Sequence, residues 1–435
     1  MQTRFSPTQL ADPGVAASEQ ILRKCVHCGF CTATCPTYVL LGDELDSPRG
    51  RIYLIKEMLE NDRPATAEVV THVDRCLSCL ACMTTCPSGV HYQHLIDHAR
   101  MHVERTYRRP LHERVLRGLL AWTLPFPGRF RAALALAALA RPFALLLPRR
   151  VRAMLELTAR RAPANAASVS HAGVVPAQGT RRARVALLLG CVQNVLDPEI
   201  NAATIRLLTR AGAEVVSVPG CCGSIVHHLG RERESHSLAA SLIERLHAEL
   251  ERGLDAIVVN ASGCGTQVKD YGFIFRDDAV LAAKAAAVSA KARDVTEALA
   301  ELGLPPVTLR GAPAVAYHSA CSMQHGQKLD AGPRKLLREA GFEVREIAEG
   351  HLCCGSAGTY NVLQPEIATR LRERKLANVA RTGAPLVATG NIGCITQLAV
   401  SAAVPVVHTV QLLDWATGGP APVGMEEVVA DRSAH

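Results

Sequence analysis

Eight cysteines near the N-terminus occur as two copies of one spacing, C-x2-C-x2-C-x3-C-P, displaced by 51 residues. The copies consist of Cys25, Cys28, Cys31 and Cys35 and of Cys76, Cys79, Cys82 and Cys86. Three thiolates at this spacing wrap one face of an iron–sulfur cube, and the fourth, which precedes a proline, reaches the neighbouring cluster. The pattern therefore predicts two [4Fe–4S] clusters.

The two ligand sets are expected to be crossed between the copies. One cluster is assigned to Cys25, Cys28, Cys31 and Cys86, and the other to Cys76, Cys79, Cys82 and Cys35. A structural zinc site is the alternative. Zinc favours paired C-x2-C knuckles joined by a longer spacer, and four cysteines within eleven residues, followed each time by proline, do not resemble that arrangement.

Small or apolar residues lie between these cysteines, and we expect them to keep water away from inorganic sulfur. They are Val26, Gly29 and Phe30 in the first copy and Leu77, Leu80 and Ala81 in the second. The 40 residues between the copies carry apolar residues at helical spacing, which predicts a helical ferredoxin-type domain. Within them, Arg49 and Arg51 either offset cluster charge or are ordinary solvated arginines.

The other eight cysteines form a second repeat, displaced by 130 to 132 residues. Its two sets are Cys191, Cys221, Cys222 and Cys264, and Cys321, Cys353, Cys354 and Cys394. Adjacent cysteines followed by a glycine that permits close backbone approach suit a cluster or a thiol/disulfide centre. A buried zinc ion or free thiols are the alternatives. Histidines near these sets are proton carriers, extra ligands or simply packed: His227, His228, His318, His325 and His351.

Alternating strands and helices surround the second repeat. Strands are predicted at 185–190, 213–218, 256–260, 314–318, 343–347 and 386–389, and helices at 199–211, 234–252, 332–340 and 364–380. Short apolar strands joined by helices imply parallel sheets. Because the cysteines follow strands, we expect each set to converge at the carboxyl edge of its sheet, where open α/β sheets place their sites.

Residues 108–161 form a basic and apolar segment with twelve arginines, no lysine and two acidic residues. Prolines and arginines divide its apolar runs, which stay shorter than the roughly 20 residues of a membrane span. A broken basic helix suits an anionic membrane surface or an acidic partner, and the alternative is a hairpin packed on its own protein. Residues 162–179 have the composition of a flexible linker.

The composition is that of a globular protein, since 435 residues include 48% apolar and 20% charged ones. Residues 1–23 contain no apolar run of signal-peptide type and no twin arginines. We therefore expect a cytoplasmic protein, peripheral at the inner face of the inner membrane, whose sixteen cysteines are ligands or redox groups. The net charge of +8 is concentrated in the basic segment, and no nucleic-acid partner is expected.

The second repeat resembles the cysteine-rich CCG domain of heterodisulfide reductase B subunits. With the N-terminal module, residues 15–415 resemble the iron–sulfur subunits of glycolate oxidase, most closely in the segments that begin at Gly190, Asn260 and Tyr317 (GCVQ, NASGCG and YHSACSMQHG). The heterodisulfide reductase motif ends in C-x-x-C, whereas Cys264 and Cys394 each stand alone here. A fifth cysteine ligand is therefore missing from each set.

The resemblance implies an oxidoreductase complex acting on CH–OH donors. A flavin-containing partner subunit with FAD would oxidise glycolate, or D-lactate, and this chain would carry the electrons toward a membrane quinone. Flavin binding by this chain is not expected, because it has no G-x-G-x-x-G after a strand and no P-loop. The alternatives are an iron–sulfur subunit of a lactate-utilisation or anaerobic glycerol-3-phosphate dehydrogenase complex, and a heterodisulfide reductase-like thiol/disulfide enzyme.

The expected fold is multidomain α/β. A helical ferredoxin-like domain with two [4Fe–4S] clusters occupies residues 1–107, and the basic helical segment and linker follow at 108–180. Two tandem cysteine-rich (CCG) α/β domains occupy 181–300 and 301–416, and residues 417–435 form a tail.

Overall fold

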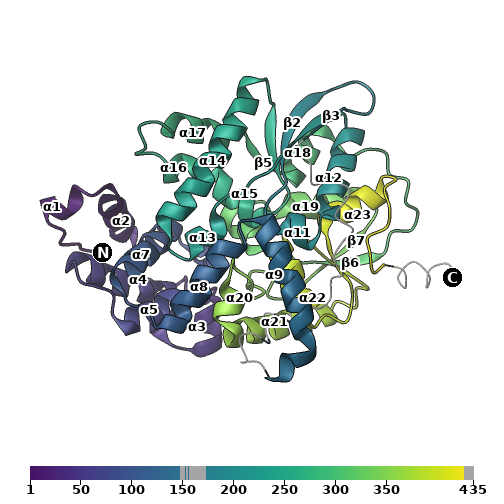
Figure 1. Ribbon diagram of the computed structural model, residues 1–435. Coiled ribbons are helices and arrows are strands. Elements are labelled where there is room, and N and C mark those ends of the chain that lie inside the picture. Colours follow the sequence, from purple (N-terminus) through teal and green to yellow (C-terminus); the bar gives the residue numbers. More distant parts are fainter. Residues whose placement is uncertain (147–151, 153–154, 156–172, 426–435) are drawn as a thin grey trace.

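The computed structural model describes residues 1–146, 152, 155 and 173–425. Residues 147–151, 153–154, 156–172 and 426–435, and with them most of the predicted linker and of the tail, lie outside the described residues. In Figure 1 the helical N-terminal part (purple) lies beside two sheet-containing parts (teal to yellow).

Short helices make up the N-terminal part. They are α1 (Pro7–Leu10), α2 (Pro13–Lys24), α3 (Pro36–Leu41), η1 (Glu44–Asp46), α4 (Pro48–Glu60), α5 (Ala67–Asp74), α6 (Ala81–Thr85) and α7 (Tyr92–Thr106). Seven of the first eight cysteines lie in the connections between them, and Cys82 lies in α6. Pro36 begins α3 directly after Cys35, where its missing N–H costs nothing. The apolar stripe of α4, which includes Ile52 and Ile55, packs into the core of this part, as the helical spacing predicts.

Up to residue 146, the basic segment forms two helices and a short 3₁₀ helix, α8 (Leu111–Thr123), α9 (Pro127–Ala140) and η2 (Arg141–Leu146). Pro125 and Pro127 separate the two helices. In Figure 1 they cross the front of the molecule between α7 and the sheets. Among the described residues, no helix has the length and hydropathy that a membrane span requires.

The first sheet has five strands in the order β1-β3-β2-β4-β5. Its strands are β1 (Val174–Val175), β2 (Ala183–Leu188), β3 (Ala213–Val218), β4 (Ala256–Val259) and β5 (Ala292–Asp294). The helices are α11 (Gln193–Leu196), α12 (Glu199–Arg210), α13 (Ser224–His228), α14 (Glu232–Glu251), α15 (Ser262–Lys269), α16 (Tyr271–Ile274), α17 (Ala282–Lys291) and α18 (Val295–Leu302). All pairs are parallel except β1 with β3.

That exception lies inside the predicted flexible linker. Val174 and Val175 pair with β3 through Val216 and Val215, so the described end of residues 162–179 is an edge strand rather than free linker. Two consecutive valines favour extended backbone and satisfy the edge of β3.

The second sheet has four parallel strands in the order β7-β6-β8-β9. Its strands are β6 (Ala314–Tyr317), β7 (Glu343–Glu346), β8 (Val387–Thr389) and β9 (Val406–His408). The helices are η3 (Ser322–Gln327, a π-helical turn), α19 (Ala331–Glu339), α20 (Tyr360–Leu363), α21 (Pro365–Ala380), α22 (Ile392–Ala399) and α23 (Thr409–Ala416). The parallel sheets predicted from the sequence are confirmed.

The two sheets share one hydrophobic core, which runs from Val185 of β2 through Tyr317 of β6 to Leu413 of α23. Their carboxyl edges are tied together, since the Ser262 N–H donates to the Gly390 carbonyl at 3.1 Å. The two sets of cysteines at these edges therefore lie on facing sides of one junction.

Candidate iron–sulfur and thiol sites

The two N-terminal cysteine loops have the same unusual backbone. His27 and Gly29 have φ of 55° and 84°, and the residues 51 positions later, Ser78 and Leu80, have φ of 49° and 63°. Three of these four residues are not glycine, so the left-handed conformation costs free energy in each loop. Such strain is typical of loops that must wrap a ligand, and here it turns successive thiols toward the same point.

The first group of thiols lies around a small cavity of about 30 Å³, lined by Cys25, Cys28, Cys31, Cys86 and also Cys82. Burial and the neighbouring Cys25 raise the pKa of Cys31 to about 11. As a free thiol this side chain would be neutral at pH 7. A bound metal ion reverses that preference, because it favours the thiolate.

The second group lies around a cavity of about 20 Å³ lined by Cys35, Cys76, Cys79 and Cys82. Burial raises the pKa of Cys79 and Cys82 well above its usual range. Each group thus combines thiols from both copies, since Cys86 lies with the first loop and Cys35 with the second. Four converging thiols in a small buried space are a donor set that fits a [4Fe–4S] cluster.

The residues between the cysteines do not all exclude water. Leu77, Leu80 and Ala81 are buried as expected, but Val26 is 67% and Phe30 is 62% exposed. The prediction was therefore wrong for the first loop, because that loop lies at the surface of the part of the chain that the structure describes. Cys28 is exposed there as well.

The two arginines of the N-terminal part have different environments. Arg51 is 1% exposed, and its guanidinium lies 3.8 Å from the Cys35 sulfur and 3.3 Å from Asp46. Burial disfavours its charge, but Cys76, Cys35 and other nearby anionic groups raise its pKa. Arg49 instead pairs with Glu44 at 2.7 Å on the half-exposed rim. Arg51 is thus buried beside the second group of thiols, whereas Arg49 lines the cavity of the first group from the rim.

Glycine is required after each pair of adjacent cysteines in the CCG parts. Gly223 and Gly355 have φ of 82° and 92°, and a Cβ atom would lie 2.9 Å from the Ser235 carbonyl oxygen or 2.5 Å from that of Ala368. The N–H groups of these glycines donate to the sulfurs of Cys221 and Cys353, each at 3.4 Å. The glycine therefore allows the loop to pack on α14 or α21 while its N–H faces sulfur.

Each CCG set converges. In the first, hydrogen bonds between thiols link Cys191 to Cys221, Cys221 to Cys222, and Cys222 to Cys264. In the second, the equivalent links join Cys321, Cys353, Cys354 and Cys394 in order. Seven of these eight side chains are buried and Cys264 is half-buried.

Lys375 of α21, a buried lysine beside the second set, was not predicted from the sequence as a site residue. Its ammonium donates to the Glu349 carbonyl at 2.7 Å. Burial lowers the pKa of Lys375, and Cys321, Cys354 and Cys353 oppose that decrease. The sequence pattern could have indicated a buried lysine, because Lys375 interrupts an apolar helical stripe that contains Leu371 and Val379.

A central cavity of about 290 Å³ lies between the three parts. Cysteines of both CCG sets line it, together with Cys79 of the N-terminal part. Leu120 and Leu124 at the end of α8 and Phe130 of α9 cover another side of the cavity. The basic segment thus packs partly on its own protein, one of the two alternatives that the sequence left open.

The histidines near the CCG sets have distinct partners. The ring of His227 pairs with Asp97 at 3.0 Å, and a His228 nitrogen lies 3.4 Å from Arg100. His325 bonds to the Thr84 hydroxyl at 2.8 Å. These contacts join the N-terminal part to the CCG parts. Among the described residues, neither ring nitrogen of His318 has a hydrogen-bond partner.

Comparisons with known proteins agree with this division into cysteine-bearing parts. A family model described as a 4Fe-4S dicluster domain matches residues 21–90, and one described as a cysteine-rich domain matches 185–269 and 315–399. The glycolate oxidase iron–sulfur subunit of Escherichia coli K12 is 43% identical over 96% of this chain and 99% of its own. The chain belongs to the glycolate oxidase iron–sulfur subunit family.

Other relatives delimit the family. The probable glycolate oxidase iron–sulfur subunit of Bacillus subtilis 168 is 32% identical over 91% of this chain and 94% of its own. A lactate utilization protein A from an Exiguobacterium strain is 28% identical, but over only 49% of this chain. Members of the glycolate oxidase iron–sulfur subunit family thus match the ferredoxin-type part, the basic segment and both CCG parts together.

Proposed function

We propose that this chain is the electron-transfer subunit of a glycolate oxidase complex. Oxidation of glycolate to glyoxylate releases two electrons and two protons at a flavin, FAD on a partner subunit. The iron–sulfur subunit then carries the electrons one at a time toward a quinone. D-Lactate, which would give pyruvate, is a second substrate of the same chemistry. The name and the end-to-end similarity of the Escherichia coli relative support this assignment.

A continuous series of thiol groups is the observation that carries the proposal. The two N-terminal groups share Cys82 at their boundary. Leu77 and Cys79 of the second group pack against Cys321 and Cys353 of the second CCG set. The central cavity then joins that set to the first CCG set. The [4Fe–4S] clusters are assigned to the crossed ligand sets, and the CCG sets are assigned further metal or cluster sites.

Electrons are proposed to enter at the exposed first loop. Cys28 and Phe30 lie at the surface there, and Tyr53 of α4 is exposed nearby, with its ring 6.5 Å from that of His27. An apolar rim around a cluster that lies close to solvent is suited to docking a redox partner, because a short distance speeds transfer and apolar contacts favour association. The flavin-containing subunit is proposed to bind this face.

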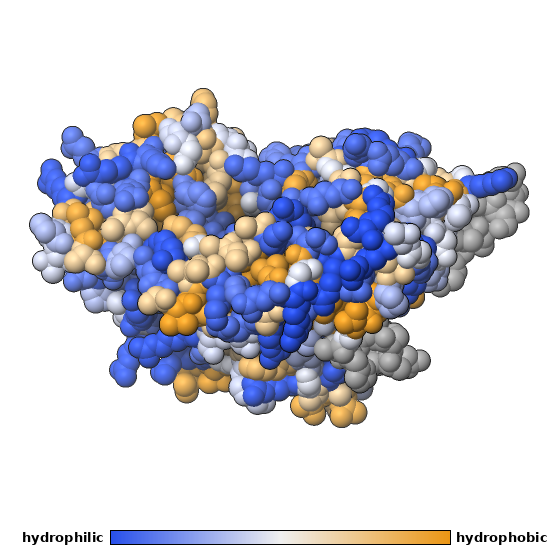
Figure 2. Space-filling model, turned by 90° about the horizontal axis from the view of Figure 1, so that it is seen from above, coloured by the Kyte–Doolittle hydropathy of each residue, from blue (hydrophilic) through white to orange (hydrophobic). Residues whose placement is uncertain are grey.

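The electron acceptor is proposed to be a membrane quinone. The chain is proposed to lie peripherally at the cytoplasmic face of the inner membrane, with α8 and α9 as the elements that contact the membrane. Exposed apolar side chains on these helices include Leu119, Trp122, Leu136 and Leu139. On the face shown in Figure 2, apolar residues instead lie in small patches separated by hydrophilic ones. Arg109 and Arg117 are buried against Asp74, so these two arginines take no part in the proposed contact with anionic lipid.

The division of the chain is proposed as in the sequence: 1–107, 108–180, 181–300 and 301–416, followed by a tail at 417–435. In this scheme residues 1–107 receive the electrons and residues 108–180 contact the membrane. Residues 181–300 and 301–416 each carry one CCG site.

The test uses the purified complex with its flavin-containing subunit and compares wild type with Cys28→Ser and Cys79→Ser. We expect glycolate to reduce the flavin at the normal rate in all three, because the hydroxy acid meets only the partner. Quinone reduction in the presence of anionic vesicles should fall by at least tenfold in both variants. Iron and acid-labile sulfide analysis would show the corresponding loss of cluster.

The matched control is a serine substitution of a small polar residue that lies near the thiols but lines neither thiol cavity, such as Thr84→Ser. Normal quinone reduction by variants that have lost cluster iron would overturn the proposal. Loss of flavin reduction in the same variants would instead place the defect in assembly of the complex.

A further inference from the structure

His318 follows β6 directly and is 1% exposed. Neither of its ring nitrogens has a hydrogen-bond partner among the residues that the structure describes. A buried polar side chain without a partner costs about 1–3 kcal/mol, and most buried polar groups in proteins are therefore satisfied. A ring with two unsatisfied nitrogens in a well-packed core indicates a ligand.

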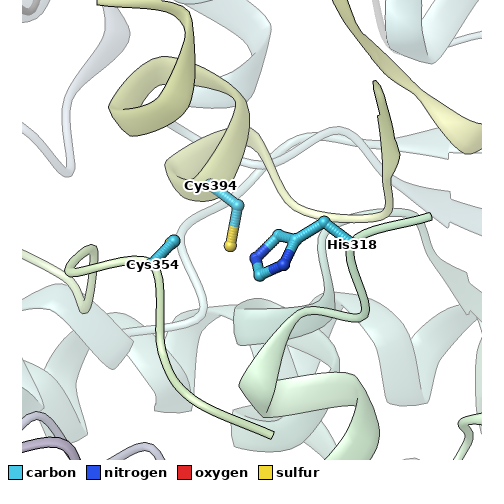
Figure 3. A group of neighbouring side chains, drawn as sticks. All are labelled: His318, Cys354 and Cys394. Atoms are coloured by element: carbon cyan, nitrogen blue, oxygen red, sulfur yellow. The ribbon is translucent and has the colours of Figure 1, made fainter. Parts of the chain in front are cut away.

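The neighbours of His318 identify the kind of ligand. A ring nitrogen of His318 and the sulfurs of Cys354 and Cys394 all lie within 4.8 Å of one another, and all three residues are buried. Figure 3 shows the imidazole facing the two cysteine side chains. The residues come from three places in the fold, which are the end of β6, the loop after β7, and α22. One ion can therefore contact all three donors.

The first CCG copy lacks this donor. The position equivalent to His318, 130 residues earlier, is Leu188 at the end of β2, which is buried in the core. Lys375 likewise has Ile243 as its equivalent, 132 residues earlier. The second copy thus has a histidine and a buried cation in places where the first copy has only aliphatic side chains. The two CCG sites differ in ligand type and in charge.

We propose that a ring nitrogen of His318 ligates an iron ion of a cluster held by the second CCG set, together with Cys354 and Cys394. This inference rests on the proposed function, which assigns metal or cluster sites to the CCG sets. Iron–sulfur chemistry is favoured over zinc for two reasons. The four cysteines and His318 supply five donors where structural zinc takes four, and Cys79 of the neighbouring redox group packs against this set.

Histidine in place of cysteine changes the redox properties of such a site. A neutral imidazole donates less negative charge than a thiolate, and replacement of cysteine by histidine raises the potential of iron–sulfur centres. The buried ammonium of Lys375 acts in the same direction. The second CCG site is therefore expected to have a higher reduction potential than an all-cysteine site at the same position.

The test detects nitrogen bound to iron and does not depend on turnover. The full-length chain, reconstituted with iron and sulfide and labelled with ¹⁵N-histidine, is reduced chemically and measured by pulsed EPR. We expect a hyperfine coupling from histidine nitrogen in the wild type and its loss in His318→Leu, which introduces the residue of the first copy. The potential of the affected signal should also shift.

The matched control is His325→Leu. His325 is a buried histidine nearby, but its ring nitrogens are partnered by the Thr84 hydroxyl and the His351 carbonyl. The coupling should persist in this variant. Its persistence in His318→Leu would overturn the inference.

The wild-type measurement decides the matter even where His318→Leu does not fold. Full iron content without histidine coupling would overturn the inference and leave the proposed electron-transfer function intact. Zinc in the second set, found by metal analysis, would also overturn the inference. Failure of electron delivery in the complex, with the coupling present, would count against the proposed function and not against this ligand.

Discussion

Arg51 shows how a single buried charge supports the N-terminal sites. Its guanidinium donates to the His72 carbonyl at 2.6 Å and to the Thr37 hydroxyl at 3.0 Å, besides its contacts with Asp46 and Cys35. A buried charge is tolerated only where partners satisfy it. Here the partners include the anionic groups that a cluster requires, so the same cation stabilises the fold and offsets thiolate charge.

Arg51→Gln is therefore expected to destabilise the protein by roughly 1–3 kcal/mol, because buried hydrogen bonds are lost while Asp46 keeps Arg75 and His72 as partners. It should also lower the reduction potential of the cluster near Cys35, because a nearby positive charge is lost. Denaturant unfolding and a redox titration monitored by EPR measure the two effects. Arg49→Gln is the control, since its partially exposed pair is worth at most about 1 kcal/mol. Equal effects of the two substitutions would contradict this role of Arg51.

For single residues, the sequence predicted which side chains belong to the sites better than it predicted how buried those side chains are and what they contact. The two ligand groups follow from repeated spacing, which is a local property. The exposure of Val26 and the burial of Lys375 depend on which parts of the chain pack against them, and spacing does not record that. The lack of a hydrogen-bond partner for His318 likewise depends on how three separate elements pack together, which spacing along the sequence does not record.

At the scale of elements, α7 and α13 form the joint between the N-terminal part and the first CCG part. Asp97 of α7 pairs with His227 of α13 at 3.0 Å. Burial alone would lower the pKa of His227, but Asp97 outweighs it and raises that pKa. Burial alone would raise the pKa of Asp97, but His227 and Arg100 hold it down to about 2. The joint is thus an ion pair at mildly acidic pH.

This pair predicts a pH dependence of stability. Since the pKa of His227 is raised in the folded protein, its contribution is complete below about pH 6.5 and is lost as the pH rises through the folded pKa. The contribution of Asp97 is complete above about pH 4 and is lost as the pH falls toward 2. His227→Gln should cost about 1.5–3 kcal/mol at pH 6 and less at pH 9, as measured by urea unfolding. A cost that is the same at both pH values would contradict the ion pair.

The strands and helices around the CCG cysteines were predicted closely. Residues 213–218 form β3 as expected, and α12 and α21 end within one residue of the predicted helices. The helices α15, α17, α18, α22 and α23 were not predicted, and neither were the strands β1, β5 and β9, each of only two or three residues. Such short strands carry too few side chains to show a period, and they form because a neighbouring strand offers unpaired backbone groups.

At the scale of the whole molecule, we expect the two CCG parts to unfold as one cooperative unit. They share a hydrophobic core, and Asp414 of α23 accepts hydrogen bonds from Arg206 and Arg210 of α12. The Asp414 side chain is 1% exposed. This junction could not be predicted from the sequence, because the repeat describes each copy and not the surface between them.

Asp414→Ala removes the buried carboxylate that Arg206 and Arg210 share, while Glu199 still pairs with Arg206, and should cost about 1–3 kcal/mol. Because the core is continuous, calorimetry should show one transition for the CCG parts that moves to lower temperature, without splitting in two. Glu199→Ala removes a partly exposed partner of Arg206 and should change stability by less than about 1 kcal/mol. Two separate transitions in wild type would contradict the shared core.

The burial of Cys353, Cys354 and Cys394 has a consequence for biogenesis. In the closed protein these thiols lie behind both sheets, the N-terminal part and α8 and α9. Cys353 and Cys394 line the central cavity, whereas Cys354 lies in the packed core, where a carrier of iron and sulfide cannot reach it. We therefore expect the cofactor of this site to be inserted while the chain is still open, before the final docking of the parts. The exposed loop at Cys28 is under no such constraint and remains accessible for repair after damage.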